Sequence, residues 1–178
     1  MIGTVINDRY EILGELGAGG MAQVYKALDK KSGAERAVKF LAEHFIDRHD
    51  VGMRFEREYL VLARLHHDNI VKVYDYGVLE EHPGLARCQP YIVMEYLPYP
   101  DLNNILYKKK KIPEKGVIVF IRQVADAFAY YHPMGLVHRD LKPSNILVSP
   151  KGRPIILDFG LVRDCRLTTL TGTGQVIG

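Results

Sequence analysis

The chain has 178 residues, which is enough for one domain with a hydrophobic core or for part of a larger domain. Hydrophobic residues make up 47% of it and charged residues 25%, as is ordinary for a globular protein. The net charge of +3 is small and dispersed along the chain, so we expect no nucleic-acid partner.

The cysteine content and the hydropathy pattern indicate a location. The two cysteines, Cys88 and Cys165, have no metal-like spacing and are too few for a disulfide framework, so we expect reduced thiols in the cytoplasm. No stretch reaches the length of a membrane span, and the first residues lack a signal-peptide pattern. We therefore expect no membrane contact in this segment, although a longer parent protein could be anchored through a segment beyond its end.

Strands are predicted for the first third of the chain. Tyr10–Leu16 and Val24–Leu28 flank a glycine-rich turn, and Arg36–Leu41 follows with apolar positions that alternate around Lys39. Further along, short strands are predicted near Ile70–Tyr76 and Tyr91–Tyr96. The later elements predicted are a short helix at Asp101–Tyr107 and a strand at Pro154–Leu157.

A helix is predicted at Val51–Leu65. Phe55, Glu58, Leu62 and Leu65 fall on one face of it. Because an unpaired buried carboxylate is costly, the glutamate in this apolar stripe needs a partner.

A longer helix, Pro113–Tyr131, is apolar nearly all round. Its polar residues form only a narrow strip at Arg122, Gln123 and Asp126. Such a helix is typical of a protein interior and needs neighbours on most sides. The residues that follow supply loops and short strands, so the pattern indicates that packing partners of this helix are missing from the C-terminal end.

The glycine-rich turn is the first segment that suggests chemistry. In Leu16-Gly17-Ala18-Gly19-Gly20-Met21-Ala22-Gln23-Val24, glycines between two strands would let backbone N–H groups approach phosphates. A plain hairpin turn is an equally good interpretation of this segment alone. A Walker P-loop is excluded, because no Gly-Lys-Ser/Thr follows and the next element is a strand.

Lys39 and Glu58 are predicted to form a pair. A lone lysine on a strand is usually surface charge, but here the glutamate on the helix face lacks a partner. Pairing would neutralise Glu58 and would place the Lys39 ammonium on the α- and β-phosphates of a nucleotide.

Two polar segments near the end of the chain carry the strongest signal. In His138-Arg139-Asp140-Leu141-Lys142-Pro143-Ser144-Asn145, Asp140 would accept a proton from a substrate hydroxyl and Lys142 would offset charge on the γ-phosphate. Asn145 and Asp158, the latter in Asp158-Phe159-Gly160 after an apolar strand, would bind magnesium. A polar surface loop would not require eight residues of these types.

In this order, the glycine loop, strand lysine, helix glutamate, catalytic loop and Asp-Phe-Gly resemble protein kinases over essentially the whole chain, from about Tyr10 to Gly178. The lysine at position 142 resembles the catalytic loop of Ser/Thr kinases rather than that of tyrosine kinases. The Gly-Gly-Met of the glycine loop resembles the loop of bacterial eukaryotic-like kinases. The resemblance implies ATP and Mg²⁺ as cofactors. It also implies an α+β fold, with a complete β-rich N-lobe and hinge at about 1–97 and the first part of a mainly helical C-lobe at about 98–178.

The resemblance implies further site residues. Met94 would be the gatekeeper, and the backbone of Glu95 and Leu97 would hydrogen-bond to adenine. Four apolar residues would sandwich the adenine ring, although core packing alone would also explain them: Leu16, Val24, Ala37 and Leu147. Regulation would involve Arg139, which in related kinases binds an activation-loop phosphate, and autophosphorylation of Thr171 and Thr173.

The Ala-Pro-Glu segment of the family and the later helices do not follow Gly178 in this sequence. We therefore expect a kinase domain that is incomplete at its C-terminus, and an isolated chain that is poorly stable and inactive. The resemblance implies a protein substrate with a Ser/Thr acceptor, and it makes a kinase–kinase dimer possible. Two alternatives are a nucleotide-binding pseudokinase or scaffold, and a small-molecule phosphotransferase with the same fold.

Overall fold

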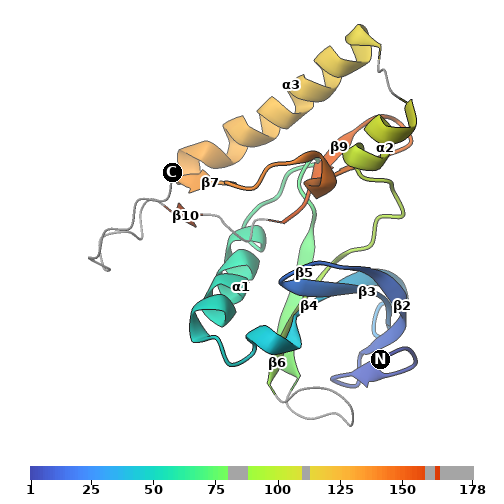
Figure 1. The fold of residues 1–178 in the computed structure, drawn as a ribbon, viewed down its shortest axis with the longest axis vertical. Coiled ribbons are helices and arrows are strands. Elements are labelled where there is room, and N and C mark those ends of the chain that lie inside the picture. Colours follow the sequence, from blue (N-terminus) through green and yellow to red (C-terminus); the bar gives the residue numbers. More distant parts are fainter. Residues whose placement is uncertain (80–87, 110–112, 159–162, 165–178) are drawn as a thin grey trace.

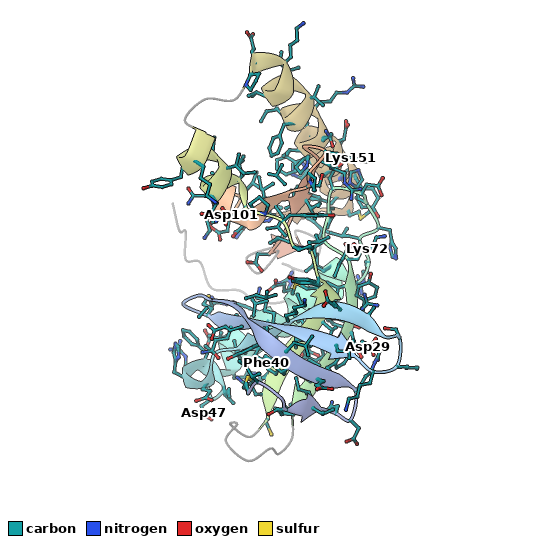
Figure 2. The ribbon with its side chains drawn as sticks, turned by 90° about the vertical axis from the view of Figure 1, so that its right-hand side faces the viewer. Asp29, Phe40, Asp47, Lys72, Asp101 and Lys151 are labelled. Atoms are coloured by element: carbon teal, nitrogen blue, oxygen red, sulfur yellow. The ribbon has the colours of Figure 1, made fainter. Side chains whose placement is uncertain are left out.

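The computed structural model describes residues 1–79, 88–109, 113–158 and 163–164. They form two parts, which Figure 1 shows as a curled sheet with one helix and a second part that carries a long helix. In Figure 2, Asp29 and Phe40 mark the sheet, and Asp101 and Lys151 mark the second part. The α+β, kinase-like architecture predicted from the sequence is confirmed.

The first part contains one antiparallel sheet of six strands. Its spatial order is β1-β2-β3-β4-β6-β5. The strands are β1 (Val5–Ile6), β2 (Tyr10–Ala18), β3 (Ala22–Asp29), β4 (Ala34–Leu41), β5 (Val73–Leu79) and β6 (Gln89–Glu95). A helix, α1 (His49–Leu62), follows β4 after a short 3₁₀ turn at Glu43–Phe45.

The second part is built from helices and pairs of short strands. The helices are α2 (Leu102–Lys109) and α3 (Glu114–Tyr131), and short 3₁₀ turns cover His132–Met134 and Pro143–Asn145. The strands are β7 (Leu136–Val137), β8 (Ile146–Val148), β9 (Pro154–Ile156) and β10 (Arg163–Asp164), paired as β7 with β10 and β8 with β9.

The strands predicted in the first third are confirmed, with longer bounds. β2 and β3 form a hairpin in which Gly17 pairs with Val24, and the turn is closed by a hydrogen bond from the Gly19 amide to the Ala22 carbonyl (2.8 Å). Strand β1 was not predicted. Its turn contains Asn7 and Asp8, both with positive φ (45° and 54°), which is the backbone that a tight hairpin turn requires.

Helix α1 buries the face predicted from its spacing. Phe55 and Glu58 are 5% and 4% exposed, and Leu62 and Leu65 are buried with them. The helix itself ends at Leu62, so Leu65 lies in the connection to β5. One side of α1 therefore packs into the main core cluster, which also contains Ala37 and Met94 of the sheet.

Helix α3 presents much of its apolar surface to solvent. Val124, Ala127 and Tyr131 are buried. In contrast, Val117, Ile118, Val119 and Ile121 are between 40% and 61% exposed. The helix lies on the far side of the second part from the sheet (Figure 1), and among the residues that the structure describes nothing covers this face. The sequence predicted neighbours on most sides of α3, and the described residues supply them on one side only.

Candidate active site

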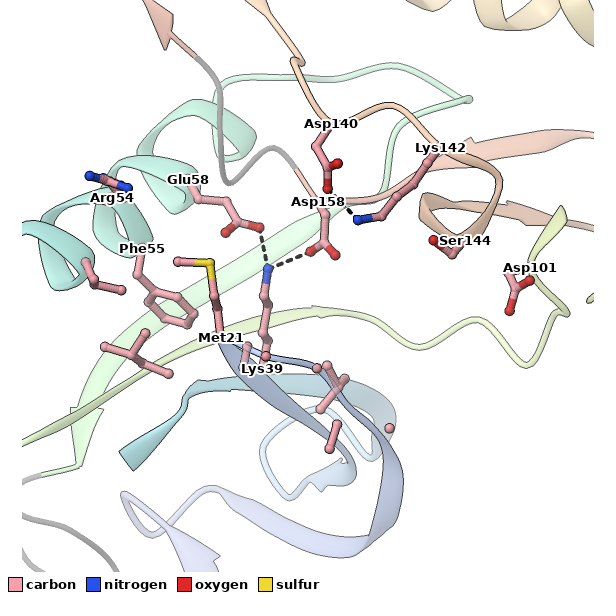
Figure 3. Close-up of a pocket in the computed structure, with 18 residues that line it drawn as sticks. Met21, Lys39, Arg54, Phe55, Glu58, Asp101, Asp140, Lys142, Ser144 and Asp158 are labelled. Atoms are coloured by element: carbon pink, nitrogen blue, oxygen red, sulfur yellow. Dashed lines mark hydrogen bonds and ion pairs between the residues drawn. The ribbon is translucent and has the colours of Figure 1, made fainter. Parts of the chain in front are cut away.

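Many of the predicted site residues line one cavity of about 690 Å³ between the sheet, α1 and the loops of the second part (Figure 3). Ligand pockets in proteins commonly have volumes of this order. Ten of the predicted site residues line it: Gly17, Ala18, Gly19, Gly20, Val24, Lys39, Glu58, Asp140, Lys142 and Asp158. They come from segments that are far apart in the sequence, so the cavity is a product of the tertiary fold.

Lys39 lies between two carboxylates at the centre of the cavity. Its Nζ donates to Glu58 Oε1 (2.8 Å) and to Asp158 Oδ1 (2.5 Å), as Figure 3 shows. The predicted Lys39–Glu58 pair is therefore present, and Asp158 joins it. The side chains of Lys39 and Glu58 are only 11% and 3% exposed, whereas that of Asp158 is 45% exposed.

Burial and charge act in opposite directions on this group. Burial alone lowers the pKa of Lys39, but the negative charges of Glu58 and Asp158 outweigh it and raise the pKa. Burial also raises the pKa of Glu58, and the Lys39 ammonium opposes that change. Lys39 is therefore a permanent cation at neutral pH, at the position where anionic phosphates would need one.

The backbone of Asp158 is held in an unusual conformation. Its φ is +49°, a left-handed value that is costly for a residue with a side chain and that persists only where the surroundings enforce it. The preceding residue is fixed by the catalytic loop, because the Leu157 amide donates to the Asn145 carbonyl (2.8 Å) and the Leu157 carbonyl contacts His138 Nε2 (2.9 Å). These contacts aim Asp158 at Lys39.

The catalytic-loop residues form a second polar group in the same cavity. Lys142 Nζ donates to Asp140 Oδ2 (2.8 Å), and Asn145 Nδ2 donates to the Asp140 carbonyl (2.9 Å) and to Oδ2 (3.1 Å). The hydrogen bond from Lys142 is the main cause of a lowered pKa for Asp140, which is therefore a carboxylate at neutral pH. Asn145 does not itself line the cavity, but it orients Asp140.

Most of the residues predicted to bind adenine do not line the cavity. Ala37 pairs with Met94 across β4 and β6, and both belong to the core cluster that Val24, Leu97 and Leu147 contact. Of the predicted apolar residues only Val24 lines the cavity. Leu16 is 45% exposed at the base of the glycine loop. The Glu95 amide already donates to the Lys72 carbonyl (2.8 Å), so a contact from Glu95 to adenine would use its carbonyl oxygen.

The regulatory predictions fall largely outside the described residues. Thr171 and Thr173 lie there, as do Phe159 and Gly160. Arg139 is described, is exposed and has a positive φ of 62°. Its predicted phosphate partner stays a prediction.

Sequence reasoning missed several residues that line the cavity. Met21 and Arg54 lie near the glycine loop and α1, and Asp101 and Ser144 lie on the opposite side (Figure 3). Arg54 precedes Glu58 by one helical turn, a spacing that could have placed it on the same face. Asp101 also caps α2, since its Oδ1 accepts from the Asn104 amide (2.7 Å). The remaining lining residues are Ala22, Leu41, Val51 and Phe55.

The oxygen donors suit magnesium better than a transition metal. Magnesium prefers oxygen ligands and is usually held by one or two protein carboxylates together with phosphates and water. Asp158 offers a carboxylate, and the Asn145 amide turns its nitrogen toward Asp140, which leaves its oxygen as the ligand atom. Among the described residues, no group of three or more His, Cys, Asp or Glu side chains is arranged to hold a metal ion.

Comparison with known proteins agrees with this geometry. The family model described as a protein kinase domain matches residues 10–175. The chain is 38% identical, over its whole length, to a probable serine/threonine-protein kinase of Clostridium acetobutylicum, and covers 26% of that protein. It is 34% identical over 99% of its length to the serine/threonine-protein kinase PknA of Mycobacterium tuberculosis, of which it covers 41%. A probable PknB of Lactococcus lactis is 36% identical and is covered to 27%.

The cavity contains a lysine between two carboxylates. It is bordered by the glycine-rich hairpin and lies beside the loop that carries Asp140, Lys142 and Asn145. These features define the class of phosphoryl-transfer proteins. The chain belongs to the protein kinase family, and the relatives named above are bacterial proteins described as known or probable Ser/Thr kinases. It spans between a quarter and two fifths of the length of these relatives. Among the described residues, no helix is both long and apolar enough to cross a membrane.

Proposed function

We propose that the protein transfers the γ-phosphoryl group of ATP to Ser/Thr hydroxyls of proteins, in a reaction that depends on Mg²⁺. The observation that carries this proposal is the position of the Lys39 ammonium, which lies between Glu58 and Asp158 in the cavity that also contains Asp140. A cation, a carboxylate that could bind metal and a second carboxylate near the acceptor position are the groups that phosphoryl transfer needs.

Each residue has a distinct role in the proposed reaction. The amides of the glycine loop and the Lys39 ammonium hold the phosphates, while Glu58 keeps Lys39 in place. Asp140 orients the acceptor hydroxyl and accepts its proton, and Lys142 offsets negative charge on the transferred group. When bound through Asn145 and Asp158, magnesium would neutralise charge on the β- and γ-phosphates.

The two alternatives make different predictions. A pseudokinase or scaffold would need a missing catalytic group, yet Lys39, Glu58, Asp140, Asn145 and Asp158 are all present. A small-molecule phosphotransferase could use the same cavity, but the similarity to Ser/Thr protein kinases favours a protein acceptor. A phosphoryl-transfer assay distinguishes both alternatives from a protein kinase.

The proposal extends to regulation and location. Thr171 and Thr173 would be autophosphorylated, Arg139 would bind the phosphate, and two kinase molecules could pair for this step. Mass spectrometry of active protein that finds no phosphate on either threonine would contradict the first point. We also propose that this domain works in the cytoplasm, because two cysteines without a metal-like spacing suit a reducing compartment.

The test is a radiolabelled phosphoryl-transfer assay on the protein as its gene encodes it. Asp140→Asn should reduce transfer to a generic protein substrate by about 10²- to 10⁴-fold, the usual contribution of a positioned general base. Asp158→Ala should abolish magnesium-dependent turnover. Asp126→Asn is the matched control, because it makes the same change at an exposed position of α3. Transfer that Asp140→Asn does not reduce would refute the proposal.

Two further arms separate the alternatives. Transfer to aminoglycosides or small alcohols, with none to proteins, would favour the small-molecule phosphotransferase. Nucleotide binding without any transfer would favour the pseudokinase. For residues 1–178 alone, we expect poor stability and no activity, because the exposed apolar side chains of α3 favour aggregation. Robust transfer by that segment, abolished by Asp140→Asn, would contradict this last expectation.

A further inference from the structure

The connection between α1 and β5 lies along strand β9, more than 80 residues later in the chain. The Ile156 amide donates to the Asn69 carbonyl (2.8 Å), and the Val71 amide donates to the Ile156 carbonyl (3.0 Å). Ile70 and Ile156 form an isolated parallel bridge between them. The connection that leads away from Glu58 is thus hydrogen-bonded to the strand that leads to Asp158.

The side chain of Asn69 adds a hydrogen bond to the first residue of strand β9. Its Nδ2 donates to the Pro154 carbonyl (2.7 Å) and, at 3.4 Å, to Gln123 Oε1 of α3. Asn69 is 6% exposed, so little water can replace these bonds. Both partners are acceptors, and the position therefore requires a donor. An aspartate of the same shape would place oxygen against oxygen.

Strand β9 is short and must hold a strained residue. It ends at Ile156, two residues before Asp158 with its φ of +49°. The catalytic loop fixes Leu157 from one side, through the Asn145 carbonyl. Such a conformation persists only when its neighbours determine it. Strand β8 pairs with one edge of β9, and the Asn69 contacts hold Ile156 and Pro154 along the other edge.

We propose that Asn69 is a positioning residue for the proposed phosphoryl transfer. By tying the α1 connection to β9, it sets the place of Asp158 relative to Lys39 and Glu58, and thereby the affinity of the site for magnesium–nucleotide. The inference rests on the proposed function for its role in turnover, but the geometry it describes can be tested separately.

The test compares variants in the protein as its gene encodes it. Asn69→Ala removes the donor, and Asn69→Asp replaces it with an acceptor of the same shape. Gln123→Ala removes only the longer of the two bonds. The matched control is Ile6→Val, which removes a methylene from the second core cluster, far from β9. Thermal melts identify whether the control is destabilised to a degree comparable to the Asn69 variants; if it is not, Ile6→Ala replaces it.

The first measurement is binding of a fluorescent ATP analogue at graded concentrations of Mg²⁺. We expect Asn69→Ala to raise the half-saturating Mg²⁺ concentration about threefold to tenfold, Asn69→Asp to raise it at least as much, and Gln123→Ala and the core control to leave it unchanged. In turnover assays, the same variants should approach the wild-type kcat at saturating Mg²⁺. A residue that only stabilises the fold would lower the active fraction and leave the half-saturating concentration unchanged.

The second measurement is hydrogen exchange at the amides of Ile156 and Val71, which needs no activity. We expect faster exchange there in Asn69→Ala than in the core control. Unchanged exchange at these amides, or an unchanged Mg²⁺ dependence of nucleotide binding, would overturn the inference. If the wild type binds magnesium–nucleotide as described but transfers no phosphoryl group, the proposed function fails while the positioning role stands.

Discussion

The Lys39 cluster provides a sharp test of the structure, because its stability effect and its chemistry can be separated. Lys39→Met would leave the Glu58 carboxylate, 3% exposed, facing Asp158 without the ammonium between them. Removal of one partner from a buried ion pair costs about 3–5 kcal/mol. Because Asp158 is 45% exposed and partly screened, we expect the lower end, about 3 kcal/mol, at pH 7.5. That is a large part of the about 5–15 kcal/mol that stabilises a typical domain.

The loss of stability in Lys39→Met should depend on pH in a defined direction. Burial raises the pKa of Glu58 above its ordinary value of 4.5, and without Lys39 nothing in the cluster opposes that change. A carboxyl whose pKa is higher in the folded than in the unfolded protein contributes stability below its unfolded pKa, and this contribution disappears as the pH rises through the folded pKa. The stability of the variant should therefore approach that of the wild type at pH 5. The gain in free energy of unfolding is up to about 1.4 kcal/mol for each unit by which the pKa of Glu58 is higher in the folded than in the unfolded variant.

Urea denaturation of wild type and variant at pH 5 and pH 7.5 measures the effect. The double variant Lys39→Met/Glu58→Met should regain most of the lost free energy of unfolding without regaining activity, since a buried ion pair can often be replaced by apolar side chains at little cost. Lys26→Met is the control, because it breaks a partly exposed pair with Glu35 and should change stability little at either pH. An equal loss at both pH values, or a double variant less stable than Lys39→Met, would refute the reasoning.

Three further variants test other parts of the fold by denaturation. Gly77→Ala should destabilise by about 1–3 kcal/mol, because its Cβ would clash with the hydroxyl end of the Tyr91 ring; unchanged stability would contradict this packing. Burial lowers the pKa of His138 below 6.5, so the unfolded protein binds the proton first and stability should fall as the pH drops below 6.5, a slope that His138→Gln should reduce. Arg9 holds the pKa of the buried Asp29 well below its usual range, and Arg9→Ala should cost about 1–2 kcal/mol near pH 7 and less at pH 3, where a flat difference would count against the pair.

Local patterns in the sequence determined most of the fold that can be described. The alternation around Lys39 and the helical spacing of Phe55 and Glu58 predicted β4 and the buried face of α1, because both periods follow from backbone geometry. The need of a buried carboxylate for a cation predicted the Lys39–Glu58 pair from two positions only 19 residues apart. The order of the motifs along the chain indicated the protein kinase family.

Only the tertiary structure decided how these groups meet. The contact between Lys39 and Asp158 joins residues 119 positions apart, and no local pattern encodes it. Asp101 and Arg54 line the cavity because α2 and α1 bring them there. Asn69 acquires its role only through β9, since its donor has a purpose only where the Pro154 carbonyl lies beside it. Sequence determined the chemical groups and the elements that carry them, whereas packing between distant segments determined which of these groups share one cavity.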